Sequence, residues 1–189
     1  MADRHTIPGS ERHAPDGAQA IGPARADERI EVTLRLRAKT PVAHALAAAR
    51  ATNDTPPGQR RYLSREEFGA SHGADPADLA AVAAFAQAHG LSVLESDAAR
   101  RSVVLAGTTQ SMDAAFGVSL QQFEHAGGSW RGRVGSISVP ADLAGIVEGV
   151  FGLDDRPAAD PHFQRYMPDR KSTRLNSSHE VPSRMPSSA

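Results

Sequence analysis

The chain of 189 residues contains no cysteine and carries a formal net charge of −1 at pH 7. The absence of cysteine excludes disulfides and cysteine-ligated zinc, and this length suits a single domain with tails. No apolar run reaches membrane-spanning length and the N-terminus lacks the apolar core of a signal peptide, so we expect no membrane partner.

Residues 1–28 are rich in proline, glycine, alanine and charge without periodicity, which predicts a disordered N-terminal arm. Residues 29–37 alternate cleanly and predict a strand with one buried face. The apolar side of this strand is Ile30, Val32, Leu34 and Leu36, and the other side is Glu31, Thr33, Arg35 and Arg37. A long connection over residues 38–61 follows, with a short helical turn in "HALAAAR".

Two helices come next. Ser64 followed by Glu67 three residues later is the signature of a capping box. Asp75 as N-cap and Pro76 at the first helical position begin the strongest helix, which Gly90 ends. Its apolar face consists of Leu79, Val82, Ala83 and Ala86, widened by Phe85.

The second half of the chain predicts a hairpin of two strands at residues 91–96 and 101–107, because only a tight turn separates them. A short helix over residues 108–117 and a strand over residues 118–124 follow. After a turn at "HAGGSW" and an extended "VGSISV", apolar residues at helical spacing predict a last helix over residues 140–153.

This order of elements is the split βαβ, ferredoxin-like pattern of an α+β fold. It predicts an antiparallel sheet with helices packed on one face, an added C-terminal helix, and one sheet face open to a partner. The domain spans residues 29–153, and the Pro- and Asp-rich residues 154–168 predict an exit linker.

The sequence contains no nucleophile elbow, no Walker A loop and no dinucleotide-binding glycine motif. No histidine pair has metal-ligand spacing on a helix with a nearby acid. The adjacent acids at 66–67 and 154–155 point in different directions, which favours a solvated face or a linker over acid–base catalysis. We therefore expect no cofactor and no catalytic or metal site in this chain.

An RNA-binding sheet of this type stacks bases on aromatic residues of its central strands. The strands at residues 29–37 and 101–107 have no aromatic residue, so we expect no nucleic-acid partner. Arg35 and Arg37 on the open face are interpreted as cross-strand partners of acids or as contacts to a protein. They are the candidate partner-facing residues of the sheet.

Three segments in order resemble the activation domain of pro-kumamolisin, of the sedolisin (serine-carboxyl peptidase) family. They are "YLSREEFGASHGADPADLAAVAAFAQAHGLSV", "RRSVVLAGTTQSMDAAFGVSLQQFE" and "VPADLAGIVEGVFGLDDRP". The resemblance implies a propeptide of a secreted, acid-acting endopeptidase, which packs in cis on a subtilisin-like catalytic domain and inhibits it. It implies a linker that crosses the active-site cleft and is cut autocatalytically at low pH. The candidate linker residues are Asp155, Arg156, Pro157, His162, Phe163 and Arg165.

In that family the catalytic Glu, Asp and Ser and a calcium site belong to the catalytic domain, whose S-G-T-S motif this sequence lacks. The chain as it stands is therefore not expected to be an enzyme. The alternative is a standalone propeptide-like inhibitor or protein-interaction domain.

Residues 169–189 resemble the translation of a sequencing adapter. "DRKSTRLNSSH" and "SRMPSSA" correspond codon by codon to two stretches of one common adapter, in the same frame. A basic, nucleic-acid-binding tail would require both matches to arise by chance. We expect this segment to be non-native, without packed structure and without function.

Overall fold

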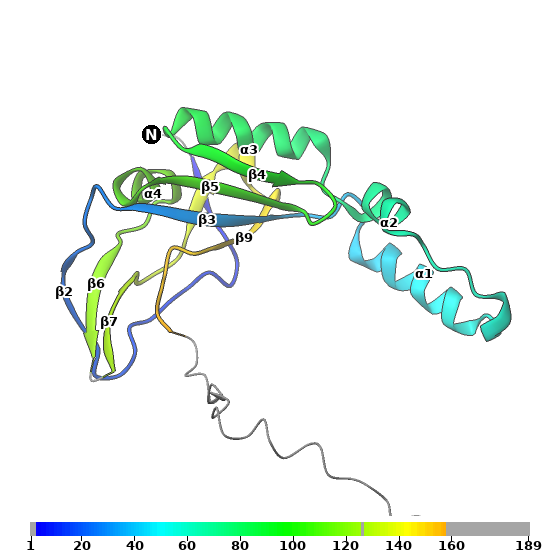
Figure 1. The fold of residues 1–189 in the computed structure, drawn as a ribbon, viewed down its shortest axis with the longest axis horizontal. Helices are drawn as coiled ribbons and strands as arrows, with labels where there is room; N and C mark the ends of the chain where they lie inside the picture. The colour runs from blue at the N-terminus through cyan, green and yellow to red at the C-terminus, as the bar shows by residue number, and fades with distance from the viewer. Residues whose placement is uncertain (1–2, 126, 158–189) are drawn as a thin grey trace, which may run out of the picture. The chain divides into compact units, whose positions relative to one another are not determined.

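The computed structural model describes residues 3–125 and 127–157 (Figure 1). The predicted linker beyond Pro157, with His162, Phe163 and Arg165, and the adapter-like residues 169–189 lie outside the described residues. In chain order the elements are β1 (Arg4–Thr6), β2 (Gln19–Pro23), β3 (Arg29–Leu36), α1 (Val42–Asp54), the 3-10 turn η1 (Pro57–Gln59), α2 (Arg65–His72), α3 (Pro76–Ala88), β4 (Ser92–Asp97), β5 (Ser102–Thr108), α4 (Thr109–Phe116), β6 (Gln121–His125), β7 (Gly128–Gly132), β8 (Ser138–Pro140), the 3-10 turn η2 (Ala141–Leu143) and β9 (Val147–Phe151).

The main sheet has four strands in the order β4-β5-β3-β9, and every neighbouring pair is antiparallel. Along β3 the buried and exposed residues alternate as predicted, because successive side chains of a strand point to opposite faces. Val32 lies opposite Leu105 and Leu34 opposite Val103, so β3 and β5 supply one apolar face.

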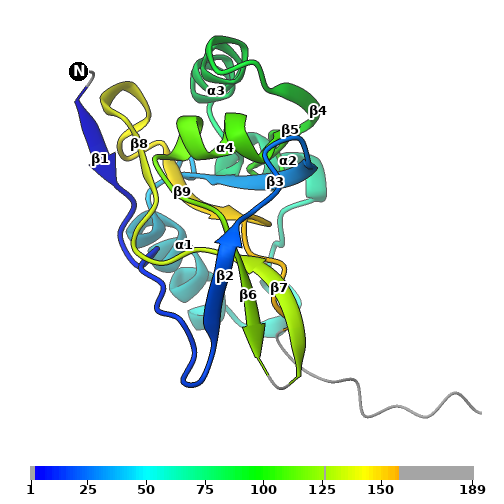
Figure 2. The same cartoon turned by 90° about the vertical axis from the view of Figure 1, so that its left-hand side faces the viewer.

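Helices α3 and α4 cover this apolar face (Figures 1 and 2). Their buried residues join the core of the sheet and include Val82, Phe85, Ala86, Met112, Ala115 and Phe116. The predicted Asp75 cap of α3 is present, because its carboxylate accepts from Ala77 N at 2.9 Å, and the Thr108 hydroxyl caps α4 by accepting from Ser111 N at 3.2 Å. The α+β fold with an antiparallel sheet and helices on one face is confirmed.

The predicted last helix over residues 140–153 is wrong. This segment forms η2 and then β9, the edge strand that pairs with β3. A register shift in the β3–β9 pairing lets both Val147 and Val150 reach the core although they are three residues apart. The bulge therefore imitates the hydrophobic spacing of a helix.

A second sheet of three strands has the order β2-β6-β7 (Figure 2). The predicted strand at 118–124 corresponds to β6, but it lies in this sheet rather than in the main one. The turn predicted at "HAGGSW" also contains the start of β7. Phe123 of β6 and Trp130 of β7 face each other with ring centroids 6.0 Å apart and hold the pair together.

The disordered arm predicted for residues 1–28 is wrong for its described part, residues 3–28. β1 pairs with β8, β2 pairs with β6, and Ile7 is buried in the core. The guanidinium of Arg4 donates to the carbonyls of Ala115 and Ser138, each at 2.6 Å. All these partners lie more than 90 residues away in the sequence, so local composition does not reveal them.

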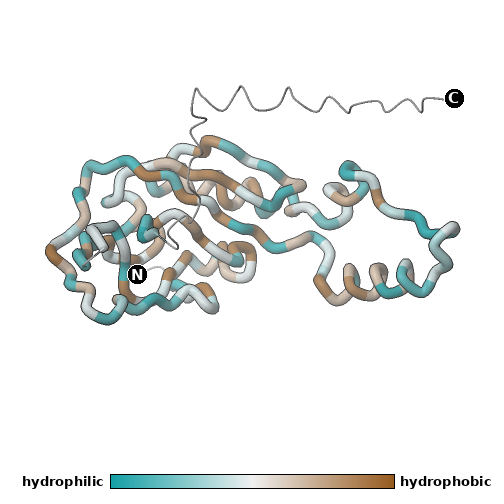
Figure 3. The backbone as a smooth tube through the Cα atoms, turned by 60° about the horizontal axis from the view of Figure 1, so that its bottom comes forward, coloured by the Kyte–Doolittle hydropathy of each residue, from teal (hydrophilic) through white to brown (hydrophobic). Residues whose placement is uncertain are grey.

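Helix α1 is longer than the single turn predicted, and neither α1 nor α2 contains a buried residue. The two helices extend from one end of the main sheet (Figure 1). Hydrophobic positions lie at the start of α1, nearest the sheet (Figure 3). The predicted capping box of α2 is present between Ser64 and Glu67.

Candidate functional site

The face of the main sheet opposite α3 and α4 is the first candidate surface, called the open face here. The register places Thr33 between Val104 on β5 and Phe151 on β9. Phe151 is 62% exposed although it is a large aromatic residue in a strand. A hollow of about 420 Å³ lies on this face, lined by Thr33, Arg35, Glu95, Arg100, Ser102, Val104 and Phe151.

Arg35 lies on the open face, where the sequence placed it. Its guanidinium donates to the Arg100 carbonyl at 2.7 Å, and Arg100 in turn pairs with Glu95 at 3.5 Å. This arrangement leaves an apolar centre around Phe151 with charged groups at its edge. Such a surface has the composition of a protein–protein interface core and rim.

Arg37 is placed differently from the prediction, because β3 ends at Leu36 and the alternation does not continue beyond it. Its Nε and Nη2 donate to the two carboxylate oxygens of Asp78 on α3, at 2.7 and 2.9 Å. These hydrogen bonds raise the pKa of Arg37. Asp78 is only 4% exposed, so the pair ties α3 to the end of β3. Arg35 and Arg37 therefore do not form one partner-facing set.

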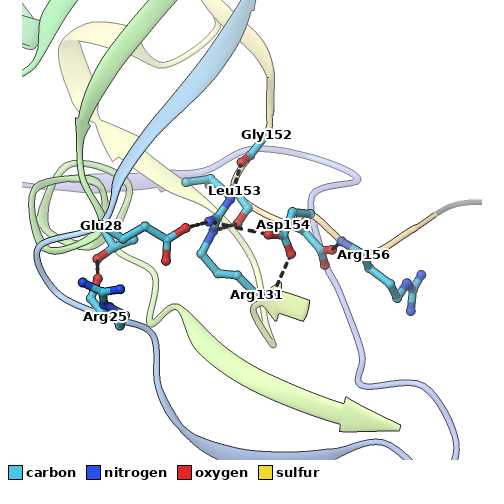
Figure 4. Close-up of polar contacts among 9 residues, drawn as sticks. Arg25, Glu28, Arg131, Gly152, Leu153, Asp154 and Arg156 are labelled. Carbon is cyan, nitrogen blue, oxygen red and sulfur yellow. Dashed lines mark hydrogen bonds and ion pairs between the residues drawn. The ribbon is translucent and has the colours of Figure 1, made fainter. Parts of the chain in front are cut away.

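A buried arginine holds the end of the domain (Figure 4). Arg131 on β7 is 7% exposed. Its guanidinium pairs with Glu28, donates to the Leu153 carbonyl at 3.1 Å, and lies 3.6 Å from Asp155 Oδ2. We call Arg131, Glu28 and Asp155, with the carbonyl groups of residues 152 and 153, the exit clamp.

The exit clamp changes where the predicted linker begins. Asp155 was predicted as a linker residue, yet its backbone and carboxylate both bond to the backbone of Arg131. Arg156 N donates to Asp154 Oδ1 at 2.9 Å, and Pro157 is the last described residue. The fold thus holds the chain through Asp155, one residue past the predicted linker start.

Sequence reasoning missed Arg131 because its acidic partners lie 103 and 24 residues away. It also missed Arg133, a second buried arginine, which donates to the Ser10 carbonyl at 2.6 Å. Burial lowers the pKa of Arg133. The only local signal is a pair of arginines beside a tryptophan in a glycine-rich stretch, which is equally typical of a solvated turn.

Within residues 3–125 and 127–157, no three side chains of His, Asp and Glu come together as metal ligands. In the same part of the chain, the helices are too short or too polar to cross a membrane.

The pro-kumamolisin activation domain family matches residues 16–156, from before β2 to the end of the exit clamp. The chain belongs to this family. It is 41% identical over 164 residues to Kumamolisin from Bacillus sp. (strain MN-32). The matched segment covers 85% of this chain and 29% of Kumamolisin. It is 27% identical over 169 residues to Tripeptidyl-peptidase sed5 from Aspergillus fumigatus. This match covers 80% of the chain and 29% of the peptidase.

The chain therefore spans less than a third of the length of both relatives. The resemblance inferred from the sequence is confirmed. The family match includes the main sheet, the three-stranded sheet and the exit clamp, and it leaves out β1.

Proposed function

We propose that this domain is the propeptide of a secreted serine-carboxyl endopeptidase of the sedolisin family. In this proposal it folds on its own core, binds the subtilisin-like catalytic domain of the same polypeptide, and inhibits it until the linker is cut autocatalytically in acid. The observation that carries the proposal is the family match, which covers residues 16–156 and so includes both sheets and the exit clamp. The name of one relative, a tripeptidyl-peptidase, supports the peptidase assignment.

The open face is the surface proposed to bind the catalytic domain. Phe151 and Val104 supply apolar contact area at its centre, and Arg35 and Glu95 supply charges at the edge. Exposed aromatic residues surrounded by polar groups are typical energetic centres of interfaces. A domain that folds by itself and presents such a face can also bind a slow-folding parallel α/β partner before that partner is complete.

The exit clamp is proposed to fix the point from which the linker enters the active-site cleft. Cleavage requires an accessible, extended chain, and the backbone through Asp155 is bonded to β7. The proposed cut therefore lies beyond Asp155, toward the segment that contains His162, Phe163 and Arg165. In this proposal, interface carboxylates that take up protons in acid weaken binding as the pH falls.

An inhibition assay tests this proposal. The chain is added to the catalytic domain of Kumamolisin, freed of its own propeptide, and the inhibition constant is measured at near-neutral and at acidic pH. We expect inhibition near neutrality and its loss in acid. The absence of inhibition at every pH contradicts the proposal.

A freestanding inhibitor is the second candidate, favoured because residues up to 157 form a compact unit with its own core. The genomic locus separates the two candidates. A catalytic domain encoded downstream in frame favours the propeptide, and a stop codon after the linker favours the inhibitor.

A further inference from the structure

A second hollow lies between the helical pair and the main sheet. It has a volume of about 330 Å³ and is bordered by α1, α2 and the turn between β4 and β5. We call it the helical groove. The residues that line it include Val42, Leu46, Phe68, His72, Ala99 and Arg100.

The helical groove exposes hydrophobic side chains from both helices. Val42, Leu46 and Phe68 are 68%, 54% and 53% exposed. Helices of about 13 residues or fewer are marginal in water, and most gain their stability by packing an apolar face. Since neither α1 nor α2 buries a residue within the described chain, their apolar side lacks the packing that such helices normally have.

Backbone hydrogen bonds join the base of the helical pair to the main domain. Lys39 N donates to the Gly73 carbonyl at 2.8 Å, and Ala74 N donates to the Ala98 carbonyl at 2.7 Å. A methyl group at Gly69 would lie 3.0 Å from the Ala99 Cβ, which shows how closely α2 approaches the β4–β5 turn.

The helical groove and the open face share two residues. Arg35 and Arg100 line both hollows, so the two surfaces meet at the β4–β5 turn. A partner that covers Phe151 and Val104 on the open face therefore lies beside the groove. The relatives are also more than three times as long as the matched segment, which leaves ample polypeptide to cover both surfaces.

We propose that the helical groove is a second docking surface for the catalytic domain in cis. The part of the catalytic domain that binds there presents a cluster of apolar side chains, flanked by a carboxylate that faces Arg35 and Arg100. This inference rests on the proposed propeptide function. It adds that α1 and α2, which do not belong to the ferredoxin-like core, increase the contact area and therefore the affinity of the propeptide for the catalytic domain.

Binding measurements on matched variants test the proposal. The double variant Leu46→Ser with Phe68→Ser removes apolar contact from the groove, and Tyr62→Ser is the control, since Tyr62 is 71% exposed and does not line the groove. Phe151→Ser reports on the open face. The dissociation constant for the freed Kumamolisin catalytic domain is measured by titration calorimetry near neutral pH.

We expect the groove variant to bind roughly tenfold more weakly or worse, as for a truncated interface anchor, and Tyr62→Ser to bind within about twofold of the unaltered chain. Far-UV circular dichroism checks that the variants keep their helices. Hydrogen exchange of the unaltered complex is a second measurement that needs no variant, and it should show protection of residues 42–54 and 65–72.

Two results separate the failure of this inference from that of the proposed function. If Phe151→Ser weakens binding while the groove variant binds normally and α1 and α2 gain no protection, the groove proposal is overturned and the propeptide function stands. If the unaltered chain does not bind at all, the propeptide function and the groove proposal that rests on it both fail.

Discussion

Arg131 and Asp155 bond to each other's backbone: Arg131 N donates to Asp155 Oδ1 at 2.6 Å, and Asp155 N donates to the Arg131 carbonyl at 3.0 Å. The Arg131 side chain then reaches back past Asp155 to Glu28. One residue of β7 therefore joins the chain just before β3 to the chain just after β9.

Replacing Arg131 by methionine is expected to loosen this exit. The change removes the partner of two carboxylates and leaves carbonyl groups without a donor, so we expect a loss of about 2 kcal/mol in the free energy of unfolding. We also expect faster cleavage around residues 152–157 in limited proteolysis. Urea unfolding and mass mapping of the first cuts measure both effects. Arg156→Met, on an exposed side chain, is the control and should behave as the unaltered chain.

The arginines at 35 and 37 should differ in what they affect. Arg37→Met leaves the buried Asp78 carboxylate without its donor, and we expect a loss of about 2 kcal/mol in urea unfolding. Arg35→Met should change stability by less than about 0.5 kcal/mol, because its side chain lies on the exposed face. In the inhibition assay the order should reverse. At equal concentrations of folded protein, Arg35→Met should inhibit more weakly than Arg37→Met. Equal stability losses for the two variants would refute the separate roles assigned here.

Asp113 should make the domain less stable at neutral pH than in mild acid. Burial raises the pKa of its carboxyl, and the hydrogen bond from Leu120 N offsets this only in part. Because the folded state binds this proton more readily than the unfolded state, its contribution to stability rises as the pH falls through the folded-state pKa and is complete below the unfolded-state pKa. Asp113→Asn keeps an acceptor for Leu120 N, so it should be more stable than the unaltered chain at pH 7. This advantage should vanish below the unfolded-state pKa in urea titrations at several pH values.

Helix α2 should respond to acid in the opposite direction. The hydrogen bond from Ser64 N, followed by the nearby Arg61 charge, lowers the pKa of the Glu67 carboxyl. Its stabilising effect is present above the unfolded-state pKa and is lost as the pH falls through the lower folded-state pKa. The hydrogen-exchange protection factors of residues 65–72, corrected for the intrinsic exchange rate at each pH, should therefore fall in acid, and Glu67→Gln should reduce this pH dependence. An unchanged acid response in Glu67→Gln would show that another group controls the helix.

Part of the fold depends on local features that the sequence already displays. The capping box of α2, the Asp75–Pro76 start of α3 and the alternation along β3 each depend on residues that are close in the chain. Short-range hydrogen bonds and the period of side-chain directions determine such features, so they could be predicted from the sequence.

The remaining features depend on partners far away in the chain. Arg131 looks like a turn residue until Glu28 and Asp155 are brought to it, and Arg37 looks like a partner of Arg35 until α3 is in place. The segment containing Val147 and Val150 shows helical spacing because a bulge shifts the strand register. Residue type and spacing cannot distinguish these cases, because tertiary contacts decide them.

The pairing of β1 with β8 has a consequence for synthesis. Translation produces Arg4 first, but its strand partner Pro140 and the carbonyl groups that its guanidinium binds come more than 100 residues later. Closing so long a loop is slow and costs chain entropy that only the completed contacts offset. Ile7 therefore stays exposed on the nascent chain until β8 leaves the ribosome. Strand β1 therefore reaches its final position late, after most of the domain has been synthesised.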